Sequence, residues 1–77
     1  MSQKFPAVKP RDLIKFLLSI GFCEVRITGS HHIFRHPISK KIVTVPIHSN
    51  KEIRTGTLRN ILRQAGVGIE EFCERLR

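Results

Sequence analysis

The chain has no tryptophan, no tyrosine and only two cysteines among its 77 residues. Cys23 and Cys73 lie far apart and form no C-x-x-C pair, so the sequence predicts neither a disulfide framework nor a cysteine-based metal site. Two buried free thiols in a reducing compartment are the simpler expectation. The lack of large aromatic side chains also leaves little for stacking unpaired bases, so we expect any nucleic acid to be recognised by backbone and shape.

Acidic residues are scarce. Six Asp and Glu stand against fourteen Lys and Arg, which gives a formal net charge of +8 and an isoelectric point near 10.6. Such a balance creates self-repulsion in the folded state, and a polyanion relieves it. The leading class of partner is therefore nucleic acid, followed by acidic proteins and anionic membranes.

Long apolar runs are also missing, and Lys4, Pro6 and Lys9 interrupt the N-terminal segment. We therefore expect no membrane span, no signal peptide, no membrane partner and a cytoplasmic protein. The length predicts a single domain over residues 1–77, with its core at about 9–66 and residues 1–8 as a frayed lead-in.

What the sequence does contain is a clear alternation of predicted elements. Apolar spacing predicts a helix over about 10–20, begun by Pro10 and stopped by Gly21. A second helix is predicted from Gly56 or Thr57 to Ala65, with Thr55 or Thr57 as its cap and Gly66 as its end. A short third helix is predicted at about 69–76, since acidic residues begin it and basic residues end it.

Three strands lie between the first two helices, predicted at 22–28, 31–36 and 42–47. In the first strand Glu24 and Arg26 share one parity, and Cys23, Val25 and Ile27 share the other. Short links favour an antiparallel meander. The predicted fold is therefore an α+β domain of order α-β-β-β-α, in which a three-stranded antiparallel sheet has helices on one face and the other face open, with an added C-terminal helix.

The second strand carries the chemistry. Phe34 is its largest apolar residue and should face the helices, so alternation places His31 and Arg35 on the open face. A neutral imidazole, with a reference pKa of about 6.5, can take a proton from a ribose 2′-OH, and its protonated form can donate to the leaving 5′ oxygen. Cations such as Arg35 or Lys40 are the candidates for stabilising charge in the transition state.

The other histidines have simpler interpretations beside this one. His32 is either a core histidine or the catalytic group in place of His31, and His36 shapes the turn before Pro37. His48 is an accessory residue of the open face or a solvated side chain. The four histidines show no ligand spacing with carboxylates or cysteines, so the sequence predicts no metal and no cofactor.

Clustered cations in the loops and on one side of the second helix predict a track that contacts phosphates, although each is also an ordinary surface residue. Eight residues are assigned to RNA contacts: Ser30, Arg35, Lys40, Lys41, Lys51, Arg54, Arg59 and Arg63. Ser30 also suits a turn, and nothing in the sequence suggests a Ser-His-Asp arrangement.

Five segments together resemble one known family. They are RDLIK (11–15) with GF (21–22), TGSHHIFRHP (28–37), VTVPIH (43–48) and GTLRNILRQAG (56–66), and EEF (70–72) is similar to a common tail. The chain resembles the HicA toxins of bacterial type II toxin–antitoxin systems. The resemblance implies a fold like that of the double-stranded-RNA-binding domain (dsRBD), endoribonuclease activity as an mRNA interferase, and a catalytic histidine at His31, with His32 as the fallback.

The resemblance also implies two partners, mRNA and an antitoxin of the HicB type that covers the active site. Two further hypotheses stay open from the residues alone: a non-catalytic RNA-binding module, and a protein-interaction module whose basic surface docks an acidic partner. Cleavage of labelled RNA in the presence of EDTA separates the first hypothesis from these two.

Overall fold

The first helix of the computed structural model, which describes residues 7–49 and 51–76, is α1 (Pro10–Ser19). Pro10 fits the first turn because its missing N–H needs no partner there, and Asp12 lies near the positive end of the helix dipole. Gly21, with φ of 105°, turns the chain out of the helix. The predicted helix and its stop are confirmed.

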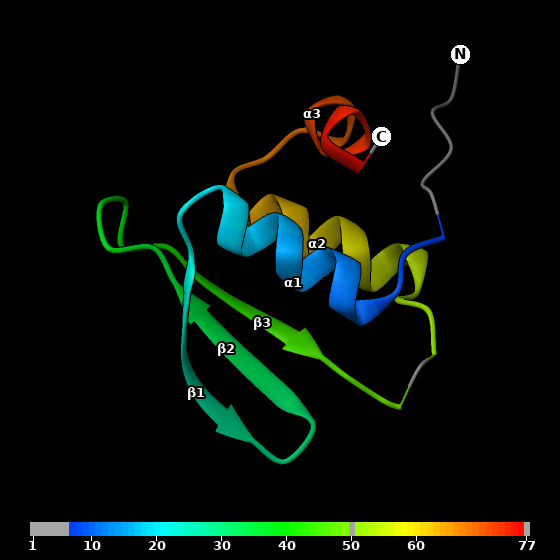
Figure 1. Ribbon diagram of the computed structural model, residues 1–77, viewed down its shortest axis with the longest axis horizontal. Coiled ribbons are helices and arrows are strands. Elements are labelled where there is room, and N and C mark those ends of the chain that lie inside the picture. The colour runs from blue at the N-terminus through cyan, green and yellow to red at the C-terminus, as the bar shows by residue number, and fades with distance from the viewer. Residues whose placement is uncertain (1–6, 50, 77) are drawn as a thin grey trace.

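The sheet contains β1 (Cys23–Thr28), β2 (His31–Arg35) and β3 (Ile42–Pro46), antiparallel and in the order β1-β2-β3. Figure 1 shows the three strands side by side, with β3 nearest the helices. Thr28 pairs with His31, so Gly29 and Ser30 form a two-residue turn, and Gly29 adopts a φ of 58°. The predicted meander is confirmed.

A β-bulge interrupts β1. Glu24 pairs with Phe34 and Arg26 pairs with Ile33, which leaves Val25 as the extra residue. Because the bulge shifts the alternation by one residue, Glu24 lies on the face of Phe34 while Arg26 lies on the opposite face. The prediction that Glu24 and Arg26 share one side of the strand is therefore wrong.

The second and third helices are α2 (Thr55–Ala65) and α3 (Ile69–Leu76). Helix α2 starts one or two residues earlier than predicted. Its N-cap is Arg54, without a side-chain hydrogen bond, so the expected threonine cap is wrong. Gly66 ends the helix in the left-handed conformation, with φ of 76°, as predicted. The element order and the three-stranded sheet agree with a dsRBD-like α+β fold.

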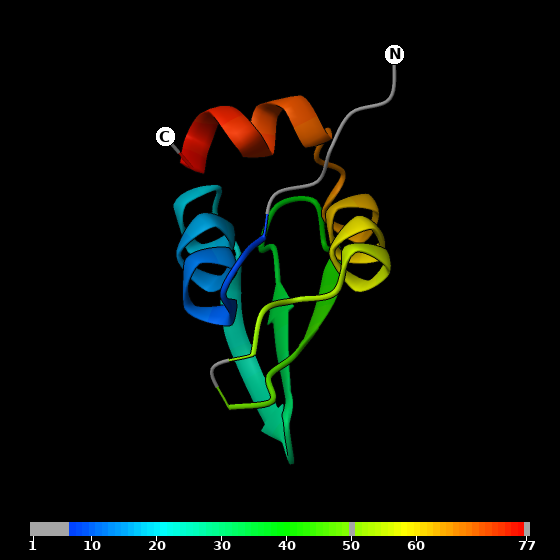
Figure 2. The same cartoon turned by 90° about the vertical axis from the view of Figure 1, so that its right-hand side faces the viewer.

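One face of the sheet is buried under α1 and α2. Phe34, Val43 and Val45 are fully buried on that face, and Leu13 and Leu58 reach them from the two helices. Figure 2 shows α1 and α2 on either side of the core with α3 above them. The helices cover β3 most closely, whereas all six residues of β1 are exposed. The other face of the sheet stays uncovered, as the sequence predicted.

Two expectations need correction, one about the N-terminal segment and one about the burial of the cysteines. Val8 is buried and its carbonyl accepts a hydrogen bond of 2.8 Å from the Ile53 N–H, so Val8 belongs to the fold and is not frayed. Residues 1–6 of the predicted lead-in lie outside the described residues. Cys23 is exposed and Cys73 half-buried, both free, so the thiols are not buried as expected. None of the helices in the described ranges has the length and apolar character to cross a membrane.

Candidate active site at the hairpin end of the sheet

His31 is the first residue of β2, directly after the Gly29–Ser30 turn. It pairs with Thr28 on one side and with Pro46 on the other. Phe34, three residues further, points into the core, so alternation turns the exposed His31 side chain to the uncovered face. The structure therefore places this imidazole on the face that the sequence predicted.

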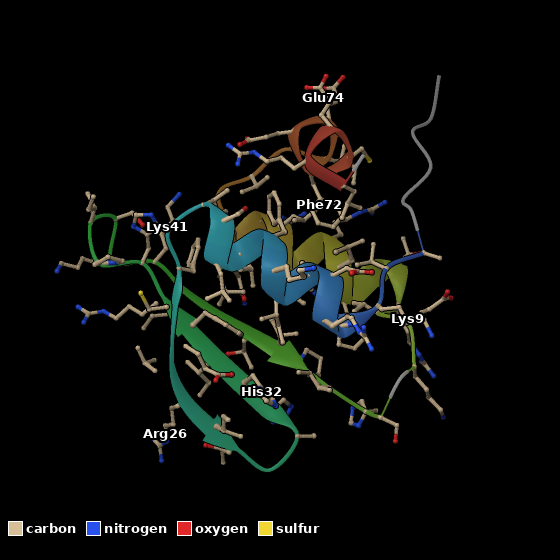
Figure 3. All side chains as sticks on the ribbon, in the orientation of Figure 1. Lys9, Arg26, His32, Lys41, Phe72 and Glu74 are labelled. Atoms are coloured by element: carbon tan, nitrogen blue, oxygen red, sulfur yellow. The ribbon has the colours of Figure 1, made fainter. Side chains whose placement is uncertain are left out.

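Arg26 shares the uncovered face with His31. It precedes Thr28 by two residues and pairs with Ile33, so it is a diagonal neighbour of His31, at a typical separation of about 7–8 Å between such positions. Figure 3 shows Arg26 extending away from the helices. This cation was not predicted from the sequence, although the two-residue turn fixes the pairing of Thr28 with His31 and hence the face of Arg26.

The cations expected at His31 lie elsewhere. Arg35 shares its face but stands at the far end of β2, roughly 13 Å away at about 3.3 Å per residue. Lys40 and Lys41 follow in the turn beyond that end, and a Cβ placed on Gly66 would meet the Lys41 ammonium group. Lys41 therefore lies over the C-terminal end of α2, where a cation suits the helix dipole. The structure does not bring Arg35, Lys40 or Lys41 to the imidazole.

A second group of predicted residues does lie at the His31 end of the sheet. The Ile47 N–H donates a hydrogen bond of 2.7 Å to the Ser30 carbonyl, which continues the pairing of β2 and β3 beyond Pro46. Next to this point is an open cleft of about 450 Å³ between the end of β3 and the start of α2. Its lining residues are Pro46, His48, Lys51, Glu52, Ile53, Arg54 and Thr57.

His32 lies on the opposite face from His31. Its Nδ1 is 2.7 Å from Oε2 of Glu24, and the two side chains are 24% and 37% exposed. The interpretation of His32 as a core histidine is therefore wrong, because its partner is a carboxylate at the margin of the core. A carboxylate on Nδ1 fixes the tautomer and leaves Nε2 available, so this pair is a second candidate for acid–base chemistry.

His36 has a structural role. Its Nε2 lies 3.1 Å from the Ile20 carbonyl, while its Nδ1 accepts hydrogen bonds from the Ile38 and Ser39 backbone N–H groups at 3.2 and 3.3 Å. This set of partners requires the tautomer with hydrogen on Nε2. The side chain joins the end of α1 to the turn between β2 and β3, which confirms that it shapes that turn.

Arg59 and Arg63 are exposed on α2, four residues apart, as the sequence analysis placed them. They lie further along α2 toward Gly66, whereas Arg54 is the N-cap of the helix and lines the cleft. Across the described residues, no group of three or more His, Cys, Asp or Glu side chains has an arrangement that would hold a metal ion.

Together these features define a small basic α+β domain with an accessible histidine at the open end of its sheet. The family model described as "HicA toxin of bacterial toxin-antitoxin" matches residues 10–67. The chain belongs to this family of toxins, so it is the toxin of a toxin–antitoxin system and has a cognate antitoxin as its partner. A comparison with curated proteins gave no match.

Proposed function

We propose that this toxin is an endoribonuclease that cleaves mRNA with His31 as its acid–base group, and thereby inhibits translation. The observation that carries the proposal is that His31 is exposed and makes no side-chain hydrogen bond or ion pair within the described part of the chain. Both neighbours in the same segment, His32 and His36, are held by other groups. An imidazole with no structural partner is free to exchange protons with a substrate.

The chemistry needs one proton moved and one bond exchanged. His31 takes the proton of a ribose 2′-OH, the 2′ oxygen attacks the adjacent phosphorus, and the bond from phosphorus to the 5′ oxygen breaks. The imidazolium returns its proton to that 5′ oxygen, leaving a 2′,3′-cyclic phosphate and a 5′-hydroxyl. The Arg26 guanidinium, on the same face, stabilises the added charge on the phosphate oxygens.

The remaining cations bind the chain on either side of the cleaved bond. Lys51 and Arg54 lie at the His31 end of the molecule, Arg59 and Arg63 continue along α2, and Arg35 marks the far end of β2. Lys40 and Lys41 extend this surface to the opposite end. An antitoxin of the HicB type that binds to the open face of the sheet would block His31. Because the substrate is mRNA, the activity belongs to the cytoplasm.

Purified protein incubated with labelled RNA in EDTA tests the proposal. We expect cleavage by the wild type, loss of cleavage in His31→Ala, and unchanged circular dichroism because the side chain is exposed. His32→Ala is the matched neighbour, and it should keep most of the activity. Cleavage by folded His31→Ala would refute the assignment.

The Glu24–His32 pair supports one alternative site for the same reaction. A charge-assisted hydrogen bond of 2.7 Å gives His32 the oriented imidazole that acid–base catalysis uses. In that case His32→Ala, and not His31→Ala, abolishes cleavage. Binding of RNA by the wild type without cleavage would instead favour the non-catalytic RNA-binding module.

A further inference from the structure

We propose that the cleft between the end of β3 and the start of α2 is a subsite for one nucleotide of the RNA, with the base against Pro46 and Ile53 and the phosphate between Lys51 and Arg54. The inference rests on the proposed ribonuclease function and gives it a defined substrate contact.

Pro46 connects the cleft to the candidate active site. It pairs with His31 across β2 and β3, and it also lines the cleft. The hydrogen bond from the Ile47 N–H to the Ser30 carbonyl holds the chain beyond β3 against the turn that carries His31. An RNA strand that presents a phosphodiester to His31 and continues across Pro46 therefore leads into the cleft.

The lining suits a nucleotide more than a bare ion. Pro46 is apolar and half-buried, and it offers a surface for one face of a base without selecting its identity. Ile53 is apolar but only 8% exposed, so it contributes the smaller part of that surface. His48 and Thr57 supply polar groups at the walls. A volume of about 450 Å³ falls within the range of roughly 300–1,000 Å³ that is typical of small-ligand sites. Apolar contact with the face of a base does not read its hydrogen-bonding edge, so we expect all four bases to be accepted.

The charge of the cleft favours an anion. The cleft is lined by two exposed cations, Lys51 and Arg54, and by a single carboxylate, that of Glu52, so its net charge is positive. The Lys51 N–H donates a hydrogen bond of 3.1 Å to the His48 carbonyl, so the Lys51 backbone is anchored to the segment that follows β3.

The test uses the full chain and four 5′-mononucleotides, which lack the bond that the enzyme would cleave. Amide chemical shifts should change for Ile53, Arg54 and Thr57, with similar affinity for the four bases. Lys51→Glu combined with Arg54→Glu should weaken binding at least fivefold. The matched control is Lys15→Glu combined with Arg75→Glu, which makes the same change of charge on the exposed surface of α1 and α3 and should bind as the wild type does.

Inorganic phosphate and uncharged nucleosides are the comparison ligands. Weaker binding of both than of the mononucleotides supports the subsite. Binding of phosphate as tight as that of the nucleotides, an equal loss in the control variant, or shifts produced only by an acidic peptide would overturn it. RNA cleavage without shifts in the cleft removes the subsite and keeps the ribonuclease, whereas shifts without cleavage keep the subsite and remove the ribonuclease.

Discussion

Glu24 and His32 are joined side chain to side chain across β1 and β2, with 2.7 Å between Oε2 and Nδ1. Neighbouring strands bring them together, but only because of the bulge at Val25. In a regular hairpin set by the Gly29–Ser30 turn, Glu24 would pair with Arg35 on the uncovered face. The extra residue moves the carboxylate to the face of His32.

Glu24→Gln separates the two candidate histidines. The substitution keeps a hydrogen-bonding side chain but removes its charge. Since the pair is partly exposed, we expect a loss of at most about 1 kcal/mol in the free energy of unfolding, measured by urea denaturation. If His31 is the acid–base group, RNA cleavage should stay within about twofold of the wild type, a change of about 0.4 kcal/mol in barrier.

The opposite result has a clear meaning. A fall in kcat for Glu24→Gln that matches the fall for His32→Ala, with both variants folded, would assign the reaction to the Glu24–His32 pair. Val25 is the extra residue of the bulge, next to Glu24, and is 58% exposed. Val25→Thr therefore provides a control on the same strand.

Arg26→Ala tests the cation next to His31. We expect kcat for RNA cleavage to fall by roughly tenfold or more but less than about 10²-fold, because a solvent-exposed charge stabilises a transition state less than a buried one does. Arg35→Ala removes the same group from the same face at the far end of β2. It should raise KM with little change in kcat, and equal kcat effects of the two variants would contradict the geometry.

Positions that depend on local rules can be predicted from the sequence, as His31 was and as Arg26 could have been. Alternation around Phe34 places His31 on the open face, and the two-residue turn would have placed Arg26 beside it. Both follow from a strand period of two and a short hairpin. The helices were predicted for a similar reason, because Pro10 and Gly66 act within one turn of their own positions.

Features that depend on distant partners were not predicted. Nothing in the residues around Val25 indicates the bulge that turns Glu24 toward His32, and Val8 is part of the core only through its bridge to Ile53. The sequence predicts that Lys41 is a cation of an exposed loop, but in the fold its side chain lies over Gly66. The net charge indicated an anionic partner without indicating which cations gather at the imidazole.

Gly21 should not tolerate a side chain. Its φ of 105° lies in a region that residues with a Cβ rarely adopt, and an added Cβ would lie 2.6 Å from Nε2 of His36. Gly21→Ala should therefore lower the free energy of unfolding by about 1–3 kcal/mol, because it adds backbone strain and disturbs the hydrogen bond from His36 to the Ile20 carbonyl. Chemical denaturation measures the loss.

Gly56→Ala is the matched control for this substitution. Gly56 lies in α2 and a Cβ there would meet nothing within 4 Å. Alanine should leave stability unchanged or raise it by about 0.5–1 kcal/mol, since it reduces the freedom of the unfolded chain. Equal stability of the two alanine variants would show that the Gly21→Ala substitution adds no backbone strain.

Helix α3 lies outside the matched range of 10–67, yet the core depends on it. Phe72 is fully buried, and its ring meets that of Phe16 edge-on with centroids 4.8 Å apart. Phe72→Ala should cost about 3–5 kcal/mol, as is typical when a buried phenylalanine is truncated. A small domain has little more stability than that, so the variant should be largely unfolded without denaturant.

A milder substitution distinguishes a packing role from a role in the reaction. Phe72→Leu keeps most of the apolar volume and should lower the urea midpoint while the folded protein cleaves RNA at the wild-type rate, because α3 lies on the other side of the helices from the uncovered face of the sheet (Figures 1 and 2). Leu76→Ala, at a residue 38% exposed in the same helix, should change stability by less than about 0.5 kcal/mol. If Phe72→Ala were as stable as Leu76→Ala, packing of α3 on the core would contribute little to stability.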